Sequence, residues 1–219
     1  MLPVTVLVVA KAPVPGIAKT RLVPAVGPEV AADIAAAALL DTLDTVAATP
    51  AAARVVALIG DLDAAQRGDE IRNRLTDFIV IGQRGTDFAD RLANAHADAV
   101  VAAGPHPVLQ IGMDTPQVSP ALMTRCCEAL LSSPAVLGMA TDGGWWVLGV
   151  HTPTVADVLR AVPMSRDDTG AVTLRALRGT GVTVTLVDEL CDVDTIDDVA
   201  AVRQASRPDS QFALTTQGV

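Results

Sequence analysis

The chain has 219 residues, half of them hydrophobic and 19% charged, so it can bury a sizeable core. Its formal net charge of −9 argues against a nucleic-acid-binding surface, because contacts to phosphates need clustered cations. No apolar run approaches the roughly 20 residues of a membrane span, and no charged segment precedes the first apolar run as in a signal peptide. The three cysteines show no metal-ligand spacing and are expected to be reduced. We therefore expect a cytoplasmic protein without a membrane span.

Short β-branched runs alternate along the chain with segments whose apolar residues recur at helical spacing. In chain order these patterns predict a strand at 4–10, a helix at 28–46, a strand at 54–59, a helix at 63–75, a strand at 78–81, a helix at 87–103, a strand at 108–111, a helix at 119–131, strands at 135–139 and 145–150, helices at 154–161 and 168–177, a strand at 182–187 and a helix at 196–205. This alternation predicts one α/β domain over residues 1–205, with a mainly parallel central sheet. The polar segment 206–219 is expected to be a disordered tail.

Both lysines of the chain, Lys11 and Lys19, lie with Arg21 in the loop that follows the first strand. Ligands bind at the carboxyl ends of the strands in such sheets, so this loop is well placed for function. Pro13 and Gly16 constrain its path, and its cations could cradle a di- or triphosphate. The loop is not a Walker A motif, because Ala rather than Gly precedes Lys19. The alternative is a solvated basic loop without a ligand.

Asp114 ends the strand at 108–111, in the sequence Gly112-Met113-Asp114. A carboxylate there would be held at the carboxyl edge of the sheet, where Mg²⁺ or Mn²⁺ could bridge it to phosphate oxygens. The alternative is a turn-forming aspartate that caps the local backbone.

Thr141-Asp142-Gly143-Gly144 joins two apolar strands and is typical of a hairpin turn. The two glycines also permit close approach of a ligand to the backbone. Trp145 and its neighbour Trp146 alternate across the second strand, so one is expected to face inward and the other outward. The outward ring could stack on a sugar or base, and core packing is the alternative.

The sequence DVDTIDDV (192–199) has two interpretations. Thr195 and Asp198 have the spacing of a helix capping box. Asp192 and Asp194 precede the helix as a D-x-D pair and could contribute oxygen ligands to a metal or contact the substrate.

Five ordered motifs carry a resemblance to a known family. They are AKAPVPGIAKTRL (10–22), LLDTLDTV (39–46), IGMDTPQVSP (111–120), TDGGWWVLG (141–149) and DVDTIDDV (192–199). With them the chain resembles a bacterial glycosyltransferase-like family, of the DUF2064 type, in the GT-A superfamily of nucleotide-diphospho-sugar transferases. That family is related to the guanylyltransferases of cofactor biosynthesis. The resemblance implies a GT-A-like (Rossmann-like) three-layer sandwich.

The resemblance also implies roles for individual residues. Asp114 falls where the superfamily has its metal-binding aspartate, although Pro116 replaces the second acid of the frequent D-x-D motif. The turn with Asp142, Gly143 and Gly144 would line the acceptor or sugar side, with Asp142 orienting or deprotonating an acceptor hydroxyl. Arg166, in PMSRDDTG (163–170), would contact a phosphate.

The function implied is transfer from a nucleotide-activated donor, in which Lys11, Lys19 and Arg21 stabilise phosphate charge. The first interpretation is a Mg²⁺- or Mn²⁺-dependent glycosyltransferase acting on a nucleotide sugar and a small-molecule acceptor. One alternative is a nucleotidyltransferase that releases pyrophosphate. Another is an inactive nucleotide-binding protein.

Overall fold

The computed structural model describes all 219 residues and contains one seven-stranded sheet. Its strands are β1 (Leu2–Lys11), β2 (Ala51–Ile59), β3 (Ile79–Gly82), β4 (Val108–Ile111), β5 (Ala135–Ala140), β6 (Trp145–Val150) and β7 (Val184–Leu190). They lie in the order β3-β2-β1-β4-β6-β5-β7, and only β6 runs antiparallel to its neighbours. The predicted single α/β domain with a mainly parallel sheet is confirmed.

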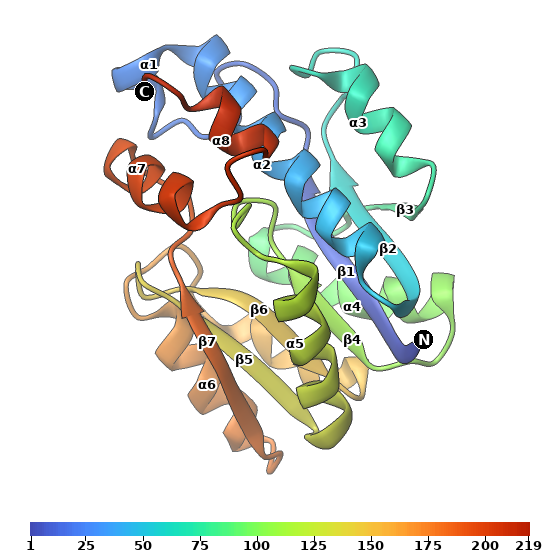
Figure 1. Cartoon of the computed structure of the whole chain (residues 1–219). Helices are drawn as coiled ribbons and strands as arrows, with labels where there is room; N and C mark the ends of the chain where they lie inside the picture. The colour runs from blue at the N-terminus through green and yellow to red at the C-terminus, as the bar shows by residue number, and fades with distance from the viewer.

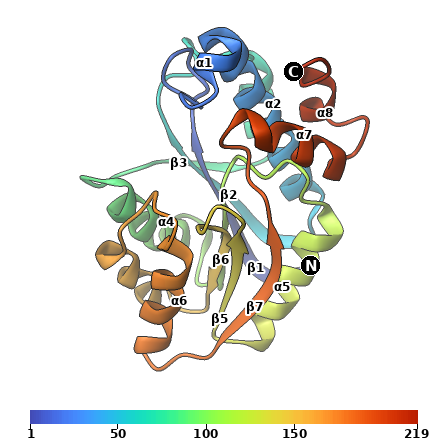
Figure 2. The same cartoon turned by 90° about the vertical axis from the view of Figure 1, so that its left-hand side faces the viewer.

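Helices cover both faces of the sheet, which makes the molecule a three-layer sandwich (Figures 1 and 2). The helices are α1 (Val23–Val26), α2 (Pro28–Ala48), α3 (Gly68–Leu75), α4 (Phe88–Ala103), α5 (Pro120–Ser132), the 3₁₀ helix η1 (Pro153–Ala161), α6 (Thr169–Gly179), α7 (Ile196–Ala205) and α8 (Gln211–Thr215). Figure 2 shows α2 and α5 on one side of the sheet and α4 and α6 on the other. No helix is both long enough and apolar enough to cross a bilayer.

The alternation of side chains along β1 explains why the sheet needs cover on both faces. Val6 and Val8 belong to the core that α2, α3 and α5 close, whereas Leu7 and Val9 belong to the core under α4, η1 and α6. All four are buried. A central strand with apolar side chains on both of its faces is typical of a parallel sheet buried between two helical layers.

Several predicted elements have different bounds or a different character. The helix expected at 63–75 begins only at Gly68, and the segment expected as a helix at 154–161 is the 3₁₀ helix η1. The predicted capping box is confirmed, and α5 also has a side-chain cap at its start. Ser119 Oγ accepts a hydrogen bond from the Leu122 amide at 3.2 Å, and Thr195 and Asp198 form a capping box at the start of α7.

The prediction of a disordered tail at 206–219 is wrong. The segment contains α8, and Phe212 is fully buried against α2 and α7. The reason is Asp41 of α2, whose two carboxylate oxygens accept the amides of Gln211 and Phe212 at 2.9 and 2.8 Å. A carboxylate at a helix N-terminus satisfies amides that have no partner within the helix. Figure 1 shows α8 lying along α2.

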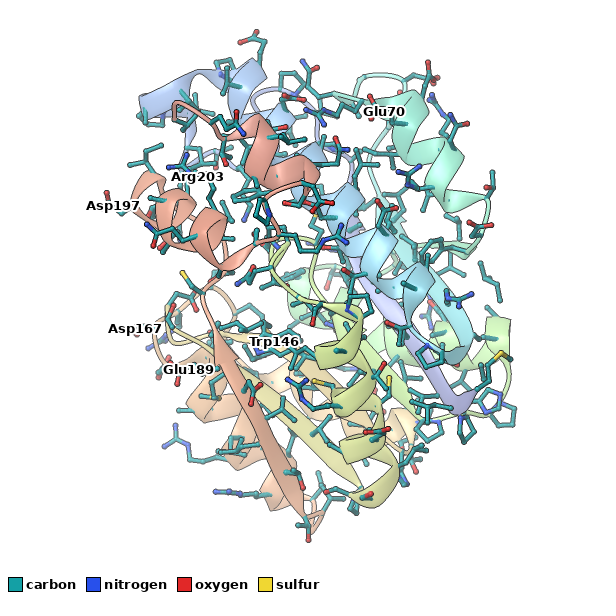
Figure 3. All side chains as sticks on the ribbon, viewed as in Figure 1. Glu70, Trp146, Asp167, Glu189, Asp197 and Arg203 are labelled. Carbon is teal, nitrogen blue, oxygen red and sulfur yellow. The ribbon has the colours of Figure 1, made fainter.

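The expectation that one tryptophan faces outward is also wrong, because helices cover both faces of the sheet. Trp146 is 3% exposed, packs in the core beneath α5 (Figure 3), and donates its indole N–H to the Asp188 carbonyl at 2.8 Å. Trp145 packs against the opposite core and is half-buried. Neither ring stands free on an open sheet surface.

Candidate functional site

The loop 12–22 leaves β1 at the carboxyl edge of the sheet, beside the segments that follow β4 and β7. Gly16 has a φ of +74°, a conformation that residues with a side chain rarely adopt. Lys19 has a φ of +47°, which is unusual for a residue other than glycine, asparagine or aspartate. The chain therefore bends at two points, and the second bend lies at the lysine itself.

The side chain of Lys19 joins three strand ends at this edge. Its ammonium lies 2.9 Å from Asp114 Oδ2 and also donates to the carbonyl of Val193, which follows β7. The Val193 amide in turn donates to the Asp114 carbonyl at 3.0 Å. Residues 95 and 174 positions away from Lys19 thus meet on one ammonium group.

The charges around Lys19 keep it protonated. Burial lowers the pKa of Lys19, but the carboxylates of Asp114, Asp192 and Asp194 more than offset that effect, so its pKa lies above the ordinary value. The Lys19 side chain is only 12% exposed, whereas the Asp114 side chain is 33% exposed. Asp114 therefore keeps access to solvent while its partner is nearly enclosed.

Gly112 makes room for the Asp114 carboxylate. A Cβ atom at this position would lie 2.8 Å from Asp114 Oδ1, closer than ordinary van der Waals contact. The glycine was visible in the sequence as part of the strand-end motif, but its steric role was not predicted. Only the folded path of the loop reveals it.

Asp192 is the carboxyl group whose titration changes most at this edge. Burial raises its pKa, and the negative charges of Asp114 and Asp142 raise it further, whereas Lys19 lowers it, with the result at about 6. The sequence analysis assigned Asp114, Asp142 and Asp192 separate roles, and the fold brings the three close enough for the charges of the first two to act on the third. The negative charges of these three carboxylates outnumber the one positive charge of the buried Lys19 beside them.

The three cations of the loop do not converge on one point. Arg21 pairs with Asp194 at the rim, where its side chain is 62% exposed. The Lys11 ammonium donates to the Ile17 carbonyl of its own loop at 3.0 Å and is exposed. Pro13 contributes its carbonyl to the Gln66 amide at 3.0 Å, so it fixes the loop to its neighbour. Lys19 is the only one of the three that reaches Asp114.

The Asp142–Gly144 segment forms the hairpin turn that the sequence predicts. Asp142 Oδ1 accepts the Gly144 amide at 2.7 Å, and β5 and β6 pair as an antiparallel hairpin. Gly143 has a φ of +88°, and a Cβ atom there would lie 1.9 Å from the Asp167 carbonyl oxygen. The turn therefore requires glycine for its packing against the loop 163–170, and its role toward a ligand stays a prediction.

Arg166 lies in the loop that packs on this turn, since the Gly170 amide donates to the Gly143 carbonyl at 2.8 Å. Its guanidinium pairs with Asp168 at 3.2 Å and is 59% exposed. The fold brings Arg166 near the turn but gives it no contact with Asp114 or Lys19, so its phosphate contact stays a prediction.

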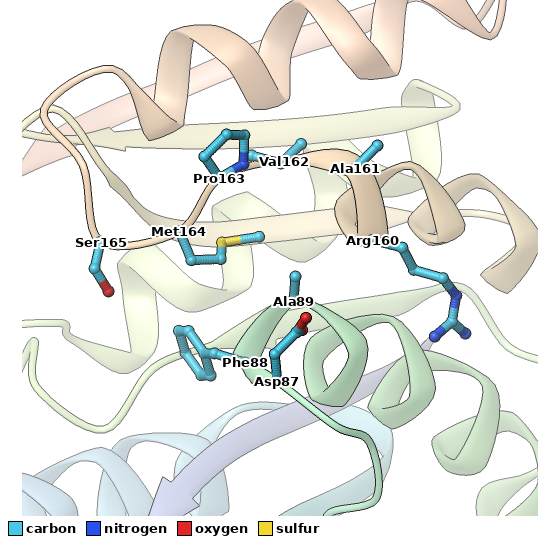
Figure 4. A pocket seen from close by; sticks show the side chains of 9 residues that line it. All are labelled: Asp87, Phe88, Ala89, Arg160, Ala161, Val162, Pro163, Met164 and Ser165. Atoms are coloured by element: carbon cyan, nitrogen blue, oxygen red, sulfur yellow. The ribbon is translucent and has the colours of Figure 1, made fainter.

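A hollow of about 530 Å³ opens beside this loop (Figure 4). The first turn of α4 supplies one wall, with Phe88 projecting from it, and residues 160–165 supply the other, with Met164 facing the hollow. Phe88 is 44% exposed. Asp114, Asp142 and Asp192 do not line the hollow, but the loop 163–170 connects it to the Gly143 turn.

The carboxylates at the carboxyl edge could hold a divalent ion only if phosphate oxygens or water supplied its other ligands. No three His, Cys, Asp or Glu side chains lie close enough together to hold a metal by themselves. Mg²⁺ and ions like it are often held by one or two carboxylates, with phosphate oxygens and water completing the shell. Asp114 and Asp192, with an excess of negative charge, fit an ion of that kind.

Comparison with solved structures identifies the class of fold. A protein from Desulfovibrio desulfuricans G20, named as a candidate nucleotide-diphospho-sugar transferase, is similar over 99% of this chain and 95% of its own, with a TM-score of 0.85 and 25% identity. Rv0371c from Mycobacterium tuberculosis H37Rv in complex with manganese is similar over 91% and 97%, with a TM-score of 0.54 and 21% identity. A nucleotidyl transferase from Methanothermobacter thermautotrophicus is similar over 92% and 96%, with a TM-score of 0.53 and 16% identity.

The fold is therefore the GT-A-like fold shared by nucleotide-diphospho-sugar transferases and nucleotidyltransferases. Within that class the chain belongs to DUF2064, a family described as an uncharacterized protein conserved in bacteria, whose pattern matches residues 42–166. No curated protein sequence matches the chain.

Proposed function

We propose that the protein transfers a sugar from a nucleoside-diphosphate sugar to a hydroxyl group of a small acceptor, with Mg²⁺ or Mn²⁺ as cofactor. The observation that carries the proposal is the meeting of Lys19 with Asp114 and the 191–195 segment at the carboxyl edge of the sheet. The structural likeness to the Desulfovibrio protein supports it, and the manganese complex of a structural neighbour supports the choice of ion.

In this reaction the bond between the anomeric carbon and the diphosphate breaks, and the acceptor oxygen forms a new bond to that carbon. The negative charge that develops on the leaving diphosphate needs fixed cations. Lys19 would supply one at the centre of the site, and Arg21 a second at its rim. A divalent ion held by Asp114 and Asp192 would add Lewis-acid charge at the same phosphates.

The acceptor would bind on the side of the Gly143 turn, with its body reaching toward the hollow under Phe88. There Asp142 would take the proton that the acceptor hydroxyl loses, since only one of its oxygens is engaged by the turn. The small-molecule acceptor and the cytoplasmic location stay predictions.

A second candidate is nucleotidyl transfer, in which a substrate phosphate attacks the α-phosphate of a nucleoside triphosphate and pyrophosphate leaves. The observation that favours it concerns which residue supplies a second carboxylate next to Asp114. Position 116 is proline, so the second carboxylate beside Asp114 would be that of Asp192, whose pKa the charge of Asp114 raises. A phosphate group between two carboxylate-bearing strand ends and a lysine is equally suited to this reaction.

The products distinguish the two reactions. The purified protein is incubated with Mn²⁺ and panels of nucleoside-diphosphate sugars and nucleoside triphosphates, and the released nucleoside diphosphate or pyrophosphate is measured. Release of nucleoside diphosphate that falls at least about a hundredfold in Asp142→Asn supports the proposal, since general bases contribute roughly that much or more. Pyrophosphate release supports the second candidate. Tight binding of a donor without either product would leave the inactive nucleotide-binding protein as the answer.

A further inference from the structure

The ammonium of Lys19 engages one of the two carboxylate oxygens of Asp114 with which a divalent ion would bind. It is 2.9 Å from Asp114 Oδ2, and it also donates a hydrogen bond to the Val193 carbonyl. The side chain is 12% exposed, so the contact is enclosed rather than a transient surface pair. Arg21, in contrast, pairs with Asp194 while most of its side chain is in solvent.

We propose that Lys19 and the divalent ion compete for Asp114, so that the ion binds tightly only after a nucleotide phosphate has drawn the ammonium away. The inference rests on the proposed function, because it takes Asp114 as a metal ligand. It adds an order of binding. The nucleotide binds to the protein first, either alone or with the ion already attached, and Asp114 coordinates the ion only afterwards.

The physical reason is charge repulsion at short range. An ammonium in hydrogen-bond contact with a carboxylate lowers the negative potential that would attract a second cation to the same group. The repulsion is strongest where solvent is excluded, as it is around Lys19. A phosphate group removes the conflict, because it is a partner for the ammonium and a ligand for the ion.

The backbone conformation and packing around Lys19 bear on how its ammonium could leave Asp114. Its own φ is +47°, an uncommon backbone conformation that the Asp114 and Val193 contacts help to hold. Ile17 is 53% exposed, whereas Ala18 and Leu22 are buried, so the shift that we propose moves the Lys19 side chain and leaves the packed backbone around it in place. Redirecting the side chain requires the ammonium to exchange its contacts with Asp114 and the Val193 carbonyl for contacts with the phosphate.

The chain offers a matched control, because it has only one other lysine. Mn²⁺ affinity is measured by electron paramagnetic resonance, without nucleotide, for the protein and for Lys19→Gln and Lys11→Gln. Both variants lose one positive charge, but only Lys19 touches Asp114. We expect Lys19→Gln to bind Mn²⁺ at least tenfold more tightly and Lys11→Gln to bind it as the unaltered protein does. Equal Mn²⁺ affinity in all three proteins overturns the competition.

Adding Asp114→Asn to Lys19→Gln separates this inference from the proposed function. The double variant should lose the gain in Mn²⁺ affinity; a gain that persists means that the ion is not on Asp114, and both proposals fail. If Lys19→Gln shows no gain while the unaltered protein binds Mn²⁺ with nucleotide, only the competition fails.

A second measurement needs no variant of Lys19 and so does not depend on how that variant folds. Lysine labelled with ¹³C at Cε gives two signals in this protein, and Lys11→Gln assigns them. At a Mg²⁺ concentration that saturates the nucleotide-bound protein, we expect Mg²⁺ alone to leave the Lys19 signal in place and Mg²⁺ with nucleotide to shift it. A shift of the same size in both samples contradicts the inference.

Discussion

His96 makes the stability of the protein sensitive to acid in a way that can be calculated. It lies on α4, is fully buried, and neither of its ring nitrogens has a hydrogen-bond partner. Thr5 and Gln110 lie on the same face of the sheet and also carry unpaired oxygens. Burial lowers the pKa of His96 from 6.5 to about 4, and the side chain of Gln110 acts in the opposite direction. The folded protein therefore holds this imidazole neutral where the unfolded chain protonates it.

Whether the free energy of unfolding rises or falls with pH depends on which state, folded or unfolded, binds the proton first. Above pH 6.5 the ring is neutral in both states, and its contribution does not change with pH. Between pH 6.5 and 4 the unfolded chain binds a proton that the folded protein does not, so the free energy of unfolding falls. The full loss is about 3 kcal/mol, since each pKa unit corresponds to about 1.4 kcal/mol. Roughly 2 kcal/mol of it should be lost by pH 5.

The raw pH profile does not isolate this effect, because Asp192 acts in the opposite direction. Its pKa is raised to about 6, so the folded protein binds that proton first and gains stability as the pH falls through 6. The informative quantity is the difference between the protein and His96→Gln, which cannot titrate at this position. Urea unfolding at pH 7 and pH 5 measures it in both proteins.

We expect the stability difference between the two proteins to shift by about 2 kcal/mol in favour of His96→Gln on going from pH 7 to pH 5. The control is His106→Gln, which removes a histidine that is only half-buried and so tests whether the effect depends on full burial. If the difference between the protein and His96→Gln is the same at both pH values, His96 is not held neutral and the reasoning is wrong.

Three further predictions concern the site and its surroundings. Gly112→Ala should fold but weaken Mn²⁺-dependent nucleotide binding, because its Cβ displaces the Asp114 carboxylate; calorimetry that shows full affinity would contradict this. Asp41→Ala should lower the free energy of unfolding by about 1–3 kcal/mol and expose α8 to proteolysis, because two buried amides lose their acceptor. A tail as resistant as before would show that Asp41 does not anchor it. Arg21→Ala should weaken nucleotide binding about tenfold or more without changing the melting temperature, whereas Arg175→Ala, on α6, should leave the binding unchanged.

The fold could be predicted because its signals are local. Buried strands appear as β-branched runs and helices as apolar residues at helical spacing, and each pattern is contained within one element. The position of Lys19 at a strand end, and of Asp114 at another, follows from the same reasoning together with the parallel sheet. The sequence therefore predicted which edge of the sheet to examine.

What the sequence could not predict depends on partners far apart in the chain. Asp41 appears within a motif that resembles the family, but its partners, the amides of α8, lie 170 residues away. The tail looked disordered because its residues are mostly polar, and only Phe212 hinted at burial. The Val193 carbonyl that holds Lys19 is a backbone atom, and no side-chain pattern in the sequence marks it.

The metal-dependent role of Asp114 is tested most directly by Asp114→Asn. Asparagine keeps the shape and caps a local turn about as well, but it removes the charge that would hold a divalent ion. The rise in melting temperature with nucleotide is measured with Mn²⁺ and with EDTA, for the protein, for Asp114→Asn and for Asp77→Asn, a control that removes an exposed carboxylate on the α3–β3 connection. We expect Asp114→Asn to fold normally and to lose the Mn²⁺-dependent part of the rise, with Asp77→Asn unchanged. A full Mn²⁺-dependent rise in Asp114→Asn would show that Asp114 is structural and that any metal must bind elsewhere.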